Sequence, residues 1–196
     1  MHILLDTNIL ISFITDPNEE YLINELSWLI DSGHVELLVP AILMKEWEKK
    51  KEQAIAKKET IYKEVNETSH NKNLKDELKD EIRILNEKID RTQSMLMKGI
   101  HIKLTNAIKI QTSDRRTENL PPFRPGNKTS YNDGLIFFSV IEYLKKNRVI
   151  EYCFITKDRD FRNEKRPNEL DPSLQFQGLD VYYGSSLEKP LETSRQ

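Results

Sequence analysis

The sequence contains a single cysteine, Cys153, which excludes an intramolecular disulfide framework and fits a reducing compartment. It has no run approaching the roughly 20 apolar residues that cross a bilayer. Its start does not resemble a signal peptide, because Asp6 interrupts the first apolar segment. These absences predict a cytoplasmic protein with no membrane partner.

A strong charge of one sign is also missing, because 30 Lys and Arg residues face 32 Asp and Glu residues, for a net charge of −2. Whole-chain electrostatics therefore neither indicates nor excludes a polyanionic partner, and a basic surface for nucleic acid would have to be local. The four histidines are scattered, so no His or Cys cluster favours zinc. Charged residues nevertheless make up 32% of the chain, so part of it must be unusually solvated.

The order of the apolar segments predicts an α/β fold. Residues 3–5 form a short apolar strand, a helix begins near Asp16 and Pro17, and residues 36–39 form a second strand. Strand, helix and strand in this order predict a right-handed parallel unit. Further helices are expected at residues 100–112 and 131–146, and further strands at residues 151–156 and 179–183.

The charged middle of the chain predicts a helical arm. Residues 41–66 and 74–97 have helical patterns, and in the second one apolar residues alternate steps of four and three, as in a coiled coil. We therefore expect residues 48–98 to form a protruding antiparallel helical hairpin. It would be inserted in a single domain of residues 1–184, whose core comprises residues 1–47 and 99–184, and residues 185–196 would be an unordered tail.

Four acidic residues stand at element boundaries: Asp6, Glu46, Asp133 and Asp158. Ligands of an open parallel sheet gather at the carboxyl ends of its strands, where we expect these side chains to meet. Clustered carboxylates repel one another unless a cation offsets their charge, and hard oxygen ligands select Mg²⁺ or Mn²⁺. Such ions suit in-line attack of water on a phosphodiester.

Four segments, in order, carry a family resemblance: LLDTNILI, the acid in MKEWEKK, YNDGLIFFSV and FITKDRDF. They resemble the four motifs of PIN-domain ribonucleases, and more closely those of a larger bacterial branch with inserted helices. The resemblance covers the core on both sides of the arm. It implies a three-layer PIN-like fold, a twisted parallel sheet between helices, and Mg²⁺- or Mn²⁺-dependent cleavage of RNA, or less often of DNA.

Carried over to this chain, the resemblance implies a catalytic and metal-binding set of Asp6, Glu46, Asp133 and Asp158. Asp160 is the alternative metal ligand to Asp158, because KDRDF offers two acids two residues apart. Asn8 and Thr156 match polar supports beside the first and last acids.

Each acid also has a purely structural alternative. Asp6 could be a turn residue whose carboxylate accepts hydrogen bonds from nearby backbone amides. Glu46 could form an exposed ion pair with Lys50, one helical turn later. Asp133 could complete a capping box with Ser130, which is compatible with a metal role.

Basic residues near these acids predict contacts with phosphates. The predicted nucleic-acid-binding residues are Lys45, Lys49, Arg115, Arg116, Arg124 and Lys128. Phe123 and Tyr131 could stack on unpaired bases or belong to the core. Arg159 and Arg162 are alternative partners for the acids of KDRDF.

The sequence thus predicts an endonuclease that hydrolyses phosphodiester bonds, in RNA more than in DNA, with Mg²⁺ or Mn²⁺ held by carboxylates. One alternative is a non-catalytic PIN-like module that binds RNA or a protein through its arm. Another is a structure-selective DNA nuclease. The sequence leaves open a protein partner such as an antitoxin, and pairing of two chains as a homodimer.

Overall fold

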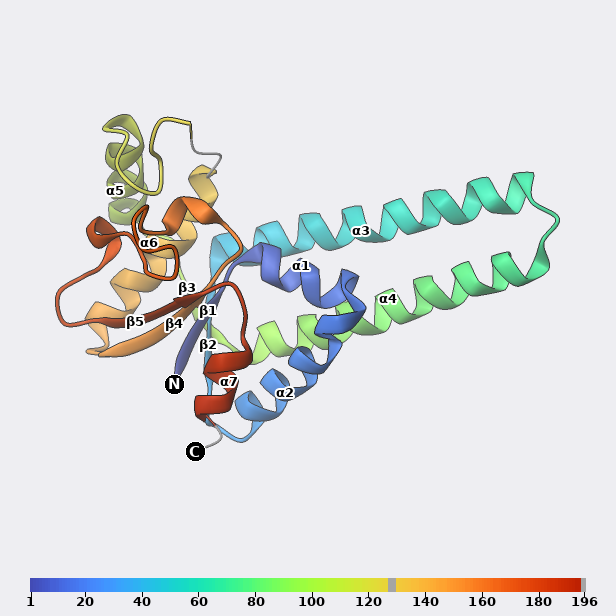
Figure 1. Ribbon diagram of the computed structural model, residues 1–196, viewed down its shortest axis with the longest axis horizontal. Helices are drawn as coiled ribbons and strands as arrows, with labels where there is room; N and C mark the ends of the chain where they lie inside the picture. The colour runs from blue at the N-terminus through green and yellow to red at the C-terminus, as the bar shows by residue number, and fades with distance from the viewer. Residues whose placement is uncertain (127–129, 195–196) are drawn as a thin grey trace.

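A computed structural model describes residues 1–126 and 130–194, and it contains a five-stranded parallel sheet in the order β3-β2-β1-β4-β5 (Figure 1). The strands are β1 (His2–Leu5), β2 (Glu36–Pro40), β3 (Ile100–Ile102), β4 (Glu151–Ile155) and β5 (Asp180–Gly184). The central strands are buried on both faces, as in other parallel sheets covered by helices.

The helices form a layer on each face of this sheet. They are α1 (Thr7–Thr15), α2 (Glu20–Asp31), α3 (Ala41–Thr68), α4 (Lys72–Lys98), α5 (Asn106–Thr117), α6 (Tyr131–Lys146) and α7 (Glu188–Ser194). Right-handed crossovers from β1 to β2 to β3 bring α1, α2 and the base of α4 to one face. The chain then crosses back to β4, on the other side of β1, so α5 and α6 cover the opposite face. The predicted three-layer α/β fold is confirmed.

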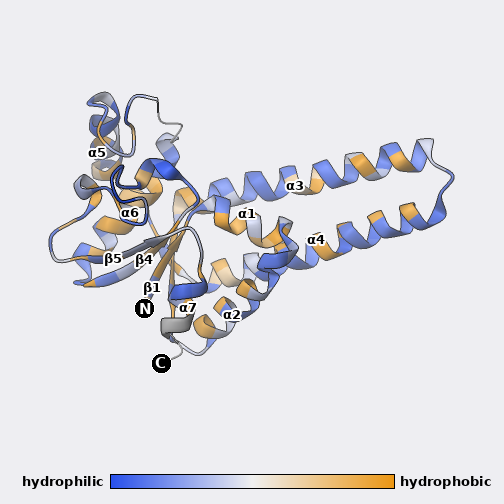
Figure 2. Cartoon of the chain, viewed as in Figure 1, coloured by the Kyte–Doolittle hydropathy of each residue, from blue (hydrophilic) through white to orange (hydrophobic). Residues whose placement is uncertain are grey.

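The predicted helical arm is present as α3 and α4, an antiparallel hairpin that projects far beyond the sheet (Figure 1). Figure 2 shows it to be mostly hydrophilic with a few apolar positions. Its base belongs to the core, because Leu85, Ile89, Met95 and Leu96 are buried there and α4 packs against α1 and α2. The part that stands free is therefore shorter than the predicted insertion of residues 48–98. None of the helices described is both long and apolar enough to cross a membrane.

Two expectations about secondary structure were wrong. Residues 100–102, predicted as the start of a helix, form the edge strand β3, and α5 begins later because the Thr105 side chain caps it by accepting from the Ile108 amide at 3.3 Å. The tail that was expected to be unordered contains α7, which packs against α2 and is preceded by the fully buried Leu187. Leu187 and Leu191 are four residues apart, and burial of both favours a helix there.

Gly134 lies in the first turn of α6, where its lack of a side chain allows a close approach. A Cβ atom at this position would lie 2.4 Å from Cζ of Phe123 and 2.9 Å from Cγ2 of Thr112. Phe123 is buried, and Thr112 belongs to α5. Gly134 therefore lets the loop after α5 pack directly onto the start of α6, next to Asp133.

We expect Gly134→Ala to lower the free energy of unfolding by about 1–3 kcal/mol, the usual effect of overpacking, despite the better helix propensity of alanine. Urea denaturation measures the change. In a Phe123→Leu background, which removes the atom nearest to the new methyl group, the same substitution should cost clearly less. Equal losses in both backgrounds would show that Phe123 is not the obstacle.

Candidate metal and nucleic-acid site

Asp6 lies between the carboxyl ends of β1 and β4, where the strand order reverses direction. Its amide donates to the Ile155 carbonyl at 2.9 Å, which continues the pairing of the two strands. Its Oδ2 accepts from Thr156 Oγ1 at 2.7 Å and from Asn8 Nδ2 at 3.3 Å. The side chain is almost fully buried, so the carboxylate is fixed at the point where open α/β sheets bind ligands. Asn8 and Thr156, the predicted supports of this acid, both donate to its carboxylate, and their role in a metal site stays a prediction.

Thr156 also connects Asp6 to the acids that follow β4. Its Oγ1 accepts from the Asp158 amide at 2.9 Å, and Asp158 Oδ1 accepts from the Asp160 amide at 2.9 Å. Asp158 thereby caps the short helix η2 (Arg159–Phe161). The Tyr183 hydroxyl donates to the Asp158 carbonyl at 3.0 Å. Both Asp158 and Asp160 thus lie on a fixed turn. We call the carboxyl edge of the sheet, where Asp6, Glu46, Asp133, Asp158 and Asp160 lie, the acidic edge. The choice between Asp158 and Asp160 as ligands stays a prediction.

Glu46, in the second turn of α3, faces the end of β1. Its Oε2 accepts from Thr7 Oγ1 at 2.8 Å. Lys50, the alternative ion-pair partner of Glu46, donates instead to Asn8 Oδ1 at 2.8 Å. Sequence reasoning did not assign Thr7 or Lys50 to the site, although Thr7 belongs to the Asp-Thr-Asn motif itself.

Asp133 forms the predicted capping box at the start of α6. Its amide donates to Ser130 Oγ at 3.3 Å, and its Oδ2 accepts from the Ser130 amide at 2.7 Å. Burial raises the pKa of Asp133 to about 6, and the negative charges of Asp6 and Glu46 add to this rise. Burial also raises the pKa of Asp6, while the hydrogen bond from Thr156 opposes it. The charges of Asp6 and Glu46 therefore act on Asp133, although the three acids come from separate segments.

These acids do not form a closed ligand group. Within residues 1–126 and 130–194, no three His, Cys, Asp or Glu side chains are close enough together to hold a metal ion. The chemistry of the donors fits a hard divalent cation, because all of them are carboxylates. Lys50 places one positive charge near Asp6.

Two of the predicted nucleic-acid-binding residues have protein partners. Arg115 donates to the Pro121 carbonyl at 2.8 Å and to Ser173 Oγ at 3.1 Å, and burial lowers its pKa. Arg124 forms ion pairs with the buried Asp171 and with Glu164. These contacts fasten the loop after α5 to the segment after β4.

The other predicted basic residues differ in their surroundings. Arg116 lies over the Tyr131 ring, 5.9 Å from its centroid. Lys45 and Lys49 are exposed on α3, one residue before and three residues after Glu46. Lys128 lies outside the described residues. Phe123 is buried against Gly134 and is a core residue, so it is not available to stack on a base.

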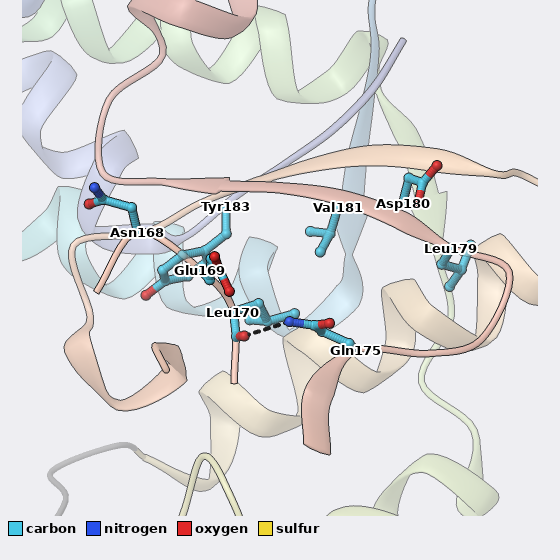
Figure 3. A pocket seen from close by; sticks show the side chains of 8 residues that line it. All are labelled: Asn168, Glu169, Leu170, Gln175, Leu179, Asp180, Val181 and Tyr183. Carbon is cyan, nitrogen blue, oxygen red and sulfur yellow. Dashed lines mark hydrogen bonds between the residues drawn. The ribbon is translucent and has the colours of Figure 1, made fainter. Parts of the chain in front are cut away.

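A cavity beside β5 contains none of the predicted acids (Figure 3). Leu170, Gln175, Val181 and Tyr183 are among its lining residues, and Gln175 Nε2 donates to the Leu170 carbonyl at 2.8 Å. Tyr183 connects this cavity to the acidic edge, because its hydroxyl reaches the Asp158 carbonyl.

The raised pKa of Asp133 makes the stability of the protein depend on pH in a defined direction. The folded state binds this proton more tightly than the unfolded state, whose pKa is near 3.8. Ionisation therefore costs stability, and the cost grows as the pH rises from about 4 to about 6 and persists above that.

In EDTA we expect Asp133→Asn to raise the free energy of unfolding at pH 7.5 by on the order of 2 kcal/mol, and to have little effect at pH 4. Asparagine keeps an oxygen that can accept from the Ser130 amide. Urea denaturation at both pH values measures the change. Asp180→Asn, an exposed change at the amino end of β5, is the matched control. An equal change in the free energy of unfolding at both pH values would contradict the assigned electrostatics.

Comparisons with known proteins agree with this architecture. No curated protein and no solved structure matches the chain. A family model described as the PIN domain matches residues 3–161, which include the four acids at the carboxyl edge and the whole arm. The chain therefore belongs to the PIN-domain family.

Proposed function

We propose that this protein is a metal-dependent endonuclease that hydrolyses phosphodiester bonds, with RNA as its main substrate. PIN domains are generally nucleases, which supports the reaction class. The observation that carries the proposal is the raised pKa of Asp133, which is caused first by burial and then by the negative charges of Asp6 and Glu46. Acids of the same charge placed near one another do not stabilise a folded protein, whereas active sites commonly contain groups with perturbed pKa values.

Asp6, Glu46, Asp133 and Asp158 would hold Mg²⁺ or Mn²⁺, with Asp160 as the alternative to Asp158. When bound, such an ion supplies Lewis-acid chemistry that eases the deprotonation of water and stabilises charge on the departing oxygen. The chain contributes orientation. Thr156 and Asn8 fix the Asp6 carboxylate by donating to its Oδ2, and Thr7 fixes Glu46 by donating to its Oε2.

Lys50 balances part of the negative charge around Asp6 and holds Asn8 in place. Asp133 is held at the positive end of the α6 dipole, where its capping hydrogen bonds limit its motion. Carboxylates positioned in advance do not have to reorganise as charge develops in the reaction, which is the main electrostatic advantage of an enzyme site.

We expect Asp6→Asn to reduce cleavage of fluorescently labelled single-stranded RNA in Mn²⁺ by about 100-fold or more, because several kcal/mol of metal-assisted stabilisation would be lost. Gel analysis of RNA and DNA oligonucleotides in parallel measures the rate and the substrate class. Asp180→Asn should retain the full rate. Wild-type protein that cleaves neither RNA nor DNA would overturn the proposal and favour a non-catalytic binding module.

Binding of the ion has a readout that does not depend on activity. At pH 7.5 we expect millimolar Mn²⁺ to raise the Tm of the wild-type protein and of Asp180→Asn by several degrees, because a ligand of the folded state stabilises it. Asp6→Asn and Asp133→Asn should lose most of this rise. Differential scanning fluorimetry measures it, and an equal rise in all four proteins would indicate binding outside the acidic edge.

A further inference from the structure

Two arginines lie just after Asp158 at the carboxyl end of β4, Arg159 at the start of η2 and Arg162 directly after it. Arg159 is exposed and Arg162 is half-buried. They line a surface hollow of about 210 Å³ together with Arg124, Asp160 and Glu164. Three guanidinium groups and two carboxylates therefore share this hollow. The charge of Arg124 is taken up by its ion pairs with Glu164 and Asp171, so Arg159 and Arg162 supply the remaining positive charge.

The backbone that carries this pair is rigid. Phe161, the last residue of η2, is buried with its ring centroid 5.1 Å from that of Phe154 and 5.4 Å from that of Phe137. The Arg162 amide donates to the Arg159 carbonyl at 3.2 Å, and Arg162 forms an isolated β-bridge with Leu170.

Arg159 is the first residue of η2, and Arg162 is its C-cap with an extended backbone. Both residues line the same hollow. The charge of Arg162 acts on Tyr183, whose hydroxyl donates to the Asp158 carbonyl. The pair is thus held next to the turn that presents Asp158 and Asp160.

The side-chain partners of the arginines in this region differ. Arg124 and Arg115 are bound to protein groups, as described above. In contrast, neither the Arg159 nor the Arg162 guanidinium makes an ion pair or a hydrogen bond with another residue in the part of the chain that the structure describes. Guanidinium groups with free donors on a fixed backbone suit bidentate contacts with phosphate oxygens.

We propose that Arg159 and Arg162 form a phosphate-binding pair that holds the sugar–phosphate backbone of a single-stranded nucleic acid beside the acidic edge. The inference rests on the proposed function for the identity of the strand as substrate. The acids alone would repel a polyanion, so positive groups at the same edge are needed to bring a phosphate to them. Arg159 and Arg162 supply this charge, while Arg115 and Arg124 hold the surrounding loops together.

The experiment measures binding of a fluorescein-labelled 12-nucleotide single-stranded RNA to the full chain in EDTA, by fluorescence anisotropy between 50 and 300 mM KCl. The variants are Arg159→Gln, Arg162→Gln and the double substitution. Arg148→Gln is the matched control. Arg148 is an exposed arginine just before the amino end of β4, whereas the acidic edge lies at the carboxyl ends of the strands. Circular dichroism verifies the fold of each variant.

We expect each substitution to weaken binding about 3- to 10-fold at 100 mM KCl, and to reduce the slope of log Kd against log salt concentration by about 0.7, the value for one phosphate contact on a single strand. Arg148→Gln should change neither quantity. Arg159→Lys should restore the slope but not the full affinity, because lysine keeps the charge and loses the bidentate geometry.

Slopes and affinities equal to those of the wild-type protein in both single variants and the double variant would overturn the inference, as would the absence of any binding to the wild-type chain at 50 mM KCl. Since binding is measured without a metal ion, the outcome is separate from the cleavage assay. A chain that binds through this pair but does not cut would contradict only the proposed function.

Discussion

The hydrogen bond from Thr156 to Asp6 joins the carboxyl ends of β1 and β4, the two strands between which the sheet reverses its order. Because both strands are buried and paired in register, the Asp6 carboxylate has a fixed place at the edge of the sheet. The other acids are positioned relative to this point. Glu46 is linked to this edge through Thr7, and Asp133, at the start of α6, is close enough for the charge of Asp6 to raise its pKa.

The acidic and the basic residues around this point have different roles. Burial and the nearby charges of Asp6 and Glu46 raise the pKa of Asp133, a local cost to stability that a bound cation would relieve. The arginines divide according to their partners: Arg124 is committed to Asp171, whereas Arg159 projects from η2. The near-zero net charge of the chain therefore conceals a strongly patterned surface.

The base of the arm contributes to the site and to the core, whereas the outer part of the arm does not. Near the sheet, α3 supplies Glu46, and α4 packs on α1 and α2 through residues such as Ile89 and Met95. The Trp47 indole donates to Gln93 at 2.7 Å and locks the two arm helices together at this base. Farther out, Lys58 forms an ion pair with Glu81, and Lys75 donates to the Asn66 carbonyl at 2.9 Å. The outer arm thus has mixed charge, which does not favour a polyanion over other partners.

The sequence by itself determined the features that depend on local spacing. The alternation of apolar segments was sufficient for the α/β fold and the arm, and Ser130 and Asp133 are three residues apart, which is enough to specify a capping box. Only the tertiary structure decided which charges meet across long separations. Arg124 and Asp171 are 47 residues apart, and no periodicity encodes that pairing. It depends on how loops pack at the sheet edge, and this packing leaves Arg159 facing outward.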